Sequence, residues 1–182
     1  MATNSNIQKN NSSGKCWVDF SDISQSLLMD LKAEPIANAA AKGSQELDAL
    51  LAGLRRDTVQ KPVIYIGAGT CGLGAGAAKT IAAIKEFLAQ QKKDADVVEV
   101  GCNGMCSDEP IVDIQIPGKA RVSFGTVTFE KVAGLLDAVL LKNQIPADLV
   151  LGQYRTQSAT PWDAVAYLDE HPFLSRQDRV VL

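Results

Sequence analysis

Residues 63–100 contain the pattern that most constrains the fold: two short apolar runs separated by a glycine-rich turn and one amphipathic helical segment. The first run is VIYI at 63–66, and the second follows at 97–100 after the polar stretch QQKKDAD. Between them, apolar residues at 77, 81, 84 and 88 repeat at the spacing of one helical face. Because a helix connects the two runs, they are expected to be parallel strands in one sheet.

A hairpin and a last helix complete this pattern. Apolar and polar residues alternate over 112–116 and over 121–124, around the turn Pro117-Gly118. This pattern predicts a half-buried hairpin of two antiparallel strands. Thr128 is in position to cap a helix whose apolar stripe runs to Leu140. The expected fold is α/β: a mixed four-stranded sheet in the order β-α-β, β-β-α, flanked by helices, as in thioredoxin-like proteins.

The rest of the chain divides into three parts. Residues 1–20 are predicted to be a disordered tail, and residues 21–58 a helical extension of two short amphipathic helices that meet near Gly43. The sheet domain spans 59–152. Residues 153–182 are expected to be a linker and the truncated start of a following domain, with a helix that opens at Thr160-Pro161 and an apolar end, RVVL.

Charge and hydropathy restrict the partners and the compartment. The 18 Lys and Arg against 21 Asp and Glu give a net charge of −3 and a pI of about 5.2, so no nucleic-acid partner is expected. No apolar stretch approaches the ~20 residues of a membrane-spanning helix, and the N-terminus lacks the apolar core of a secretion signal. We therefore expect a cytoplasmic protein without direct membrane insertion, at most peripheral to a membrane complex. The single histidine, His171, excludes sites that need two imidazoles.

Three of the four cysteines lie where the strands of the β-α-β unit end. Cys71 is in the turn after the first strand, whereas Cys102 and Cys106 are spaced C-x3-C in the glycine loop after the second. Both strand ends share one edge of the sheet, so three thiols can converge there, and thiolates are the ligands of iron–sulfur clusters. The alternatives are ordinary buried thiols and a redox sensor that uses Cys102 and Cys106.

The turn before the helix also fits two nucleotide motifs. Gly67–Gly72 matches G-x-G-x-x-G, with Glu99 in the next strand to accept a ribose, which is typical of dinucleotide binding. A cysteine loop and a hairpin follow instead of another crossover, which disfavours this hypothesis. The run GAGAAKT at 74–80 has Ala78 where a P-loop needs glycine, so Lys79 is expected to be a charge on the helix surface.

The chain resembles the thioredoxin-like [2Fe–2S] ferredoxin domains in three runs, VIYIGAGTCGLGAGA, GCNGMCSDEPIVDIQIPG and RVSFGTVTFEKV. It is most similar to those fused before the flavoprotein (NADH-binding) subunit of NADH:quinone oxidoreductases and NAD-linked hydrogenases, over roughly residues 45–155. The tail from Pro161 resembles the entry segment of that flavoprotein subunit. The resemblance implies a [2Fe–2S] cluster with Cys71, Cys102 and Cys106 among its ligands.

One ligand of the family pattern is missing. The family spaces its first cysteine pair C-x4-C, which puts the first member at Ile66, and isoleucine cannot ligate iron. A fourth ligand would come from elsewhere, either an oxygen ligand or Cys16, the remaining thiol of the chain. Cys16 is otherwise interpreted as a small residue in an apolar anchor, beside Trp17 and Phe20.

The leading hypothesis is therefore an electron-transfer module of an NADH dehydrogenase-type oxidoreductase that binds a [2Fe–2S] cluster with an incomplete cysteine set. The alternative is a cluster-free, degenerate ferredoxin domain that acts in docking or assembly. The resemblance implies a flavoprotein and other subunits of such a complex as partners. FMN and NADH would bind in a region downstream of Leu182, so no complete active site is expected within this chain.

Overall fold

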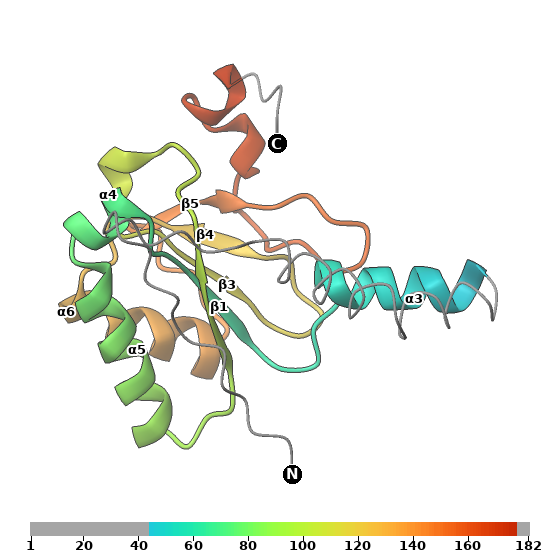
Figure 1. The fold of residues 1–182 in the computed structure, drawn as a ribbon, viewed down its shortest axis with the longest axis horizontal. Helices are drawn as coiled ribbons and strands as arrows, with labels where there is room; N and C mark the ends of the chain where they lie inside the picture. The colour runs from blue at the N-terminus through green and yellow to red at the C-terminus, as the bar shows by residue number, and fades with distance from the viewer. Residues whose placement is uncertain (1–43, 178–182) are drawn as a thin grey trace, which may run out of the picture. The chain divides into compact units, whose positions relative to one another are not determined.

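The computed structural model describes residues 44–177, whose strands form one mixed sheet with the order β2-β1-β3-β4-β5 (Figure 1). The strands are β1 (Val63–Gly67), β2 (Asp96–Val100), β3 (Val112–Gln115), β4 (Val122–Phe124) and β5 (Val150–Gln153). The α-helices are α3 (Ser44–Arg55), α4 (Thr70–Gly74), α5 (Ala77–Gln90) and α6 (Phe129–Leu136). Shorter turns are the 3-10 helices η1 (Cys106–Asp108), η3 (Leu168–Glu170) and η4 (Leu174–Arg176), and the π-helical η2 (Asp137–Leu141) that continues α6.

Strand pairing confirms the predicted thioredoxin-like arrangement of the first four strands. β1 pairs in parallel with β2 and antiparallel with β3, so that Ile64 lies opposite both Val97 and Ile114. β3 and β4 form the antiparallel hairpin around the Pro117-Gly118 turn. β5 adds a fifth strand, antiparallel to β4, that the sequence pattern missed because four residues with a glycine among them give too short a signal.

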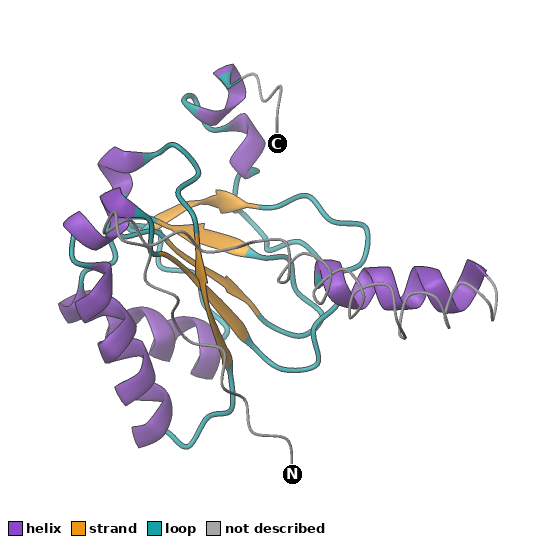
Figure 2. Cartoon of the chain, in the orientation of Figure 1, coloured by secondary structure: helices purple, strands orange, loops and turns teal. Residues whose placement is uncertain are grey.

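Two helices cover the apolar face of this sheet (Figure 2). α5 and α6 pack against each other, and the Thr80 hydroxyl of α5 donates a hydrogen bond to the Val127 carbonyl at 2.9 Å. Each fully buried aliphatic or Phe side chain contributes about 1.5–3 kcal/mol, so this layer supplies much of the folding free energy. Its buried members include Ile64, Ile66, Ile84, Val112, Ile114, Val122, Phe124, Val132 and Leu136.

The opposite face of the central strands is polar, and it is buried as well. Asp113 and Gln115, expected to face water, are only 5% and 7% exposed. Arg121 donates from Nε to Asp113 Oδ2 at 2.9 Å and lies between the rings of Tyr65 and Tyr154, 3.7 and 4.7 Å from their centroids. The prediction of a half-solvated hairpin is therefore wrong, because these stacked side chains cover its polar face.

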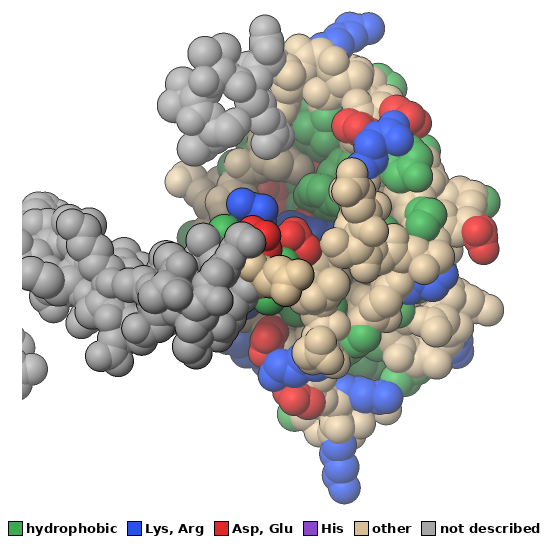
Figure 3. All heavy atoms as spheres, turned by 90° about the vertical axis from the view of Figure 1, so that its right-hand side faces the viewer, with side chains coloured by type: hydrophobic (Ala, Val, Ile, Leu, Met, Phe, Trp, Pro, Cys, Tyr) green, Lys and Arg blue, Asp and Glu red, His purple; other side chains and the backbone are tan. Residues whose placement is uncertain are grey.

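The apolar run at 97–100 suggests a buried strand, but β2 is the edge of the sheet and its side chains are half-buried or exposed. Lys61 Nζ lies 3.0 Å from Asp94 Oδ1 and 2.8 Å from Asp96 Oδ1, at the start of this edge. Figure 3 shows acidic and basic side chains next to one another on one side of the molecule. Charges on an edge strand oppose pairing with another chain.

The segment after β5 differs from the expected linker and helix. Thr160 forms an isolated bridge with Lys119, and no helix begins there. Trp162 is 8% exposed and donates from Nε1 to the Ala120 carbonyl at 2.9 Å. The prediction of a helix at Thr160 is wrong because burial of this indole against the hairpin turn holds the chain in an extended path.

α3 confirms the second of the two predicted N-terminal helices. The first of them, the tail at 1–20 and the end RVVL lie outside the described residues. The domain boundaries at residues 20, 58 and 152 stay predictions. None of the helices between residues 44 and 177 combines the length and the apolarity that crossing a bilayer requires.

Candidate metal centre

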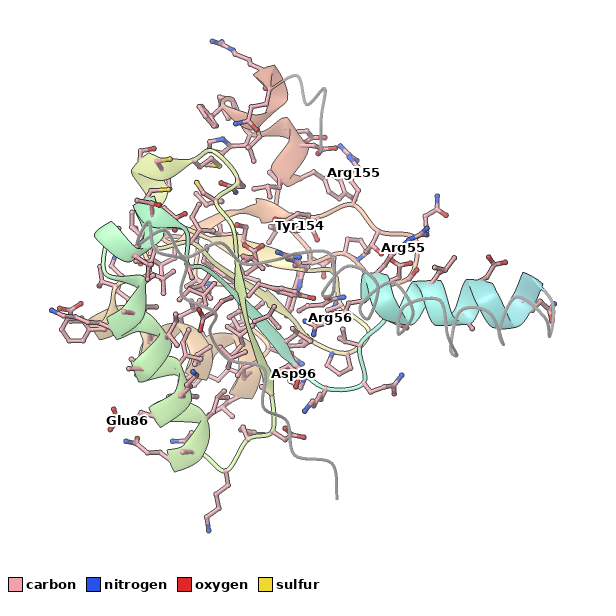
Figure 4. The ribbon with its side chains drawn as sticks, viewed as in Figure 1. Arg55, Arg56, Glu86, Asp96, Tyr154 and Arg155 are labelled. Carbon is pink, nitrogen blue, oxygen red and sulfur yellow. The ribbon has the colours of Figure 1, made fainter. Side chains whose placement is uncertain are left out.

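Three thiols meet where β1 and β2 end. Cys71 is the second residue of α4, directly after β1, while Cys102 and Cys106 lie in the loop that follows β2. Their three Sγ atoms all lie within 4.8 Å of one another, and the Sγ atoms of Cys102 and Cys106 are 3.6 Å apart. The predicted convergence is thus present in the fold, and Figure 4 shows sulfur atoms gathered at this end of the sheet beside α4.

Local hydrogen bonds shape the loop that carries two of these thiols. Gly104 has a φ of +100°, a conformation that L side chains rarely adopt, and its N–H donates to Cys102 Sγ at 3.3 Å. The Asn103 side-chain oxygen accepts from the Met105 N–H at 3.0 Å. Met105, 2% exposed, anchors the loop in the interior and leaves the cysteines on either side exposed.

The end of the loop is fixed to the connection between β4 and α6. The Asp108 carbonyl, at the end of η1, accepts from the Thr126 N–H at 2.6 Å, and the Pro110 carbonyl accepts from the Val127 N–H at 2.9 Å. Cys106 begins η1, so these bonds hold its turn of helix against the hairpin side of the sheet. Neither contact is visible in the local sequence pattern.

The glycines of the G-x-G-x-x-G motif serve close packing. A Cβ on Gly72 would lie 2.2 Å from the Gly67 carbonyl oxygen, and a Cβ on Gly67 would lie 2.7 Å from Glu109 Oε2. α4 can therefore approach the end of β1 only with glycine at position 72, whereas Gly67 leaves room for the Glu109 carboxylate. Glu99, the ribose ligand in the disfavoured dinucleotide hypothesis, is exposed on β2. Lys79 is exposed on α5, with Nζ 5.8 Å from the Phe129 ring centroid.

The pKa values of Cys71 and Cys102 are shifted in opposite directions. Hydrogen bonds from the Cys102 and Cys106 thiols lower the pKa of Cys71, which favours its thiolate. The Gly104 N–H favours the thiolate of Cys102, but burial and hydrogen bonding to the other two thiols raise its pKa to about 12. The neighbouring thiols thus favour the thiolate at Cys71 and disfavour it at Cys102. A disulfide between Cys102 and Cys106 would require a small approach of the two sulfurs, so the redox-sensor alternative stays open.

The predicted position of the fourth ligand has a different role. Ile66 is 0% exposed and belongs to the core between the sheet and the helices. Cys16 lies outside the described residues. Among residues 44–177, the cysteines at 71, 102 and 106 form the one group of three or more metal-ligating side chains. The described residues therefore supply three of the four thiolates that a [2Fe–2S] cluster takes.

Glu109 is a residue of this region that the sequence analysis did not single out. Its side chain is buried, Oε2 accepts from the Ile111 N–H at 2.8 Å, and Oε1 has no hydrogen-bond partner among the described residues. Glu109 and Cys102 both line a cavity of about 270 Å³ that extends to Asp113 and Arg121. An acidic residue three positions after a cysteine carries no signal of burial, so sequence reasoning had no means of finding it.

This chain is similar to a hydrogenase subunit and to a ferredoxin. No family model matches the chain. The NADP-reducing hydrogenase subunit HndB of Solidesulfovibrio fructosivorans is 27% identical over 85 residues, which are 46% of this chain and 68% of that subunit. A thioredoxin-like [2Fe–2S] ferredoxin from Aquifex aeolicus aligns with a TM-score of 0.46 and 17% identity, over 53% of this chain and 96% of its own. A second structure of that ferredoxin, of the wild type, has a TM-score of 0.44 at 17% identity, over 51% and 98%. The hydrogenase subunit agrees with the resemblance to NAD-linked hydrogenases stated from the sequence motifs.

Proposed function

We propose that this chain is an electron-transfer domain of a pyridine-nucleotide-linked oxidoreductase and that Cys71, Cys102 and Cys106 bind a [2Fe–2S] cluster. The observation that supports this most directly is the convergence of the three Sγ atoms within 4.8 Å at one edge of the sheet. Thiolates are the ligands of such clusters, and the cluster supplies one-electron transfer when bound. The chain's own part is to hold three thiolates in place and to donate the Gly104 N–H to one of them.

The proposed partners are inferred from the hydrogenase subunit HndB. HndB is, by its name, a subunit of a hydrogenase that reduces NADP. We propose that this chain likewise works within a cytoplasmic complex of several subunits and exchanges electrons with a flavoprotein. In this proposal the flavin and the nicotinamide bind to that flavoprotein, and NADH or NADPH is its substrate.

Anaerobic reconstitution tests the cluster. We expect about two irons and two sulfides per chain and an EPR signal after reduction. Cys71→Ser, Cys102→Ser and Cys106→Ser should each lose most of the bound iron, whereas Ser107→Ala, in the same loop, should keep it. Cys16→Ser should also keep the iron, and loss of iron in that variant would identify the fourth ligand.

Two results would contradict electron transfer. One is a chain that never takes up iron under reducing, anaerobic conditions. The other is stoichiometric zinc without sulfide, because Zn²⁺ has no redox chemistry at such a site. Metal analysis of the chain purified from its native cells distinguishes zinc from iron.

The burial of Ile66 at the fourth ligand position favours a second candidate, a cluster-free domain that positions subunits. In that case the double variant Cys102→Ser/Cys106→Ser should leave assembly and activity of the complex intact. Assembly without electron transfer in this variant would rule the second candidate out.

A further inference from the structure

The cysteine loop is in contact with the far end of the described chain. A Cβ on Gly104, between Cys102 and Cys106, would lie 2.6 Å from Gln177 Nε2 and 3.8 Å from Phe173 Cε1. These two side chains therefore lie directly against Gly104 Cα. The same glycine donates its N–H to Cys102 Sγ at 3.3 Å. Two side chains about 70 residues away along the chain thus contact the residue that hydrogen-bonds a candidate ligand.

The start of this C-terminal segment, residues 168–177, packs tightly against β5. Leu168 is 5% exposed, and a Cβ on Gly152 of β5 would lie 2.9 Å from its backbone N and Cα. Just before the segment, the Gln153 N–H donates to the Ala166 carbonyl at 2.9 Å. The base of the segment is therefore packed on the backbone of the last strand, and Figure 1 shows the segment beside that strand.

The tip of the segment has its own internal bonds. The Ser175 N–H donates to the His171 carbonyl at 2.9 Å, and the Gln177 N–H donates to the Leu174 carbonyl at 3.0 Å. These bonds form the turns that bring Phe173 and Gln177 to Gly104. Phe173 is nevertheless 47% exposed, so burial in the core does not explain its place, and the contact with the loop does.

We infer that the C-terminal segment is a positioning element for the metal centre: Phe173 and Gln177 hold Gly104 so that its N–H stays on the Cys102 sulfur. The redox consequence rests on the proposed function. A reduced cluster carries one more negative charge than an oxidised one, so an N–H···S bond stabilises the reduced form more and raises the reduction potential. Removing the two side chains should therefore lower the potential.

The first measurement needs no metal. In the metal-free full chain carrying Phe173→Ala and Gln177→Ala together, hydrogen exchange of the Gly104 amide, followed by NMR, should be about tenfold faster than in the parent chain. Phe173→Tyr, which keeps the ring, and Arg176→Lys, whose exposed side chain keeps its charge, should exchange at the parent rate. An unchanged rate in the double variant overturns the positioning role.

The second measurement uses the iron-loaded chain. The double variant should show a more negative midpoint potential in a redox titration, with the iron content and the far-UV CD spectrum of the parent chain. Faster amide exchange with an unchanged potential overturns the redox part of the inference. A chain that binds no iron defeats the proposed function instead, and the exchange measurement then still decides the positioning role.

Discussion

Gly72 occupies a position in α4 that admits no side chain. Its Cβ would lie 2.2 Å from a backbone carbonyl oxygen, and backbone atoms cannot move aside as a flexible side chain can. We expect Gly72→Ala to lower the free energy of unfolding by ~2–3 kcal/mol, the upper range for overpacking. Urea denaturation of the metal-free chain measures this change.

Gly74, two positions later in the same helix, is the matched control. No heavy atom lies within 4 Å of its Cβ position, and its φ is not in the left-handed region. Gly74→Ala should therefore leave stability unchanged or raise it slightly, since alanine is the better helix former by up to about 1 kcal/mol. Equal losses in both variants would show that α4 tolerates no alanine for a reason other than the contact with Gly67.

The high pKa of Cys102 makes metal binding depend on pH. With a pKa of about 12, this thiol is protonated at neutral pH and must release its proton to become a ligand. Apparent affinity should therefore rise with pH between 6.5 and 8.5, by about tenfold per pH unit for each proton released. Titration of the metal-free chain with Co²⁺ at several pH values tests this, and a flat profile would contradict thiolate ligation by Cys102.

The candidate site was predictable from sequence as far as topology determines it. Cys71 and Cys102 follow parallel strands of one β-α-β unit, and parallel strands end at one edge whatever the remaining residues are. The surroundings of the thiols were not predictable. Glu109, Thr126 and Gln177 reach the site through contacts between distant segments, and a local pattern carries no trace of them.

At the scale of elements, Trp162 attaches the segment after β5 to the hairpin of β3 and β4. It joins this segment to the hairpin turn by burial and by its bond to the Ala120 carbonyl. We expect Trp162→Ala to cost ~3–5 kcal/mol of unfolding free energy, as for other buried aromatic residues. Trp162→Phe should cost less because the ring volume is largely kept. If the segment were a mere linker, both variants would have the stability of the parent chain in thermal unfolding.

The elements themselves were predicted where one face is apolar and regular. α5 and α6 carry stripes that match the helical repeat, and β1 is a continuous apolar run. The polar face of β3 was mispredicted because Asp113 and Gln115 are buried by Arg121 and by two tyrosines, one from β1 and one that follows β5. The alternation of apolar and polar residues shows which side chains share a face of the strand. It does not show whether the polar face is exposed to water.

On the scale of the whole molecule, the segment after β5 packs against the sheet. Trp162 and Leu168 are both buried, at 8% and 5% exposure. A fragment of residues 52–177 should therefore unfold in one cooperative transition with dispersed NMR signals. A fragment of residues 52–153 should be much less stable, and equal midpoints of urea unfolding for the two fragments would restore the domain end predicted at 152.

The contact between Gln177 and Gly104 also limits how far the residues after Gln177 can lie from the cysteine loop. Covalent geometry limits five residues to a span of at most about 18 Å. Leu182 therefore lies within about 18 Å of Gln177. A spin label placed there would report on the cysteine loop when the loop holds a paramagnetic centre, such as a reduced [2Fe–2S] cluster. A label at Leu182 thus measures the centre without changing any residue that builds it.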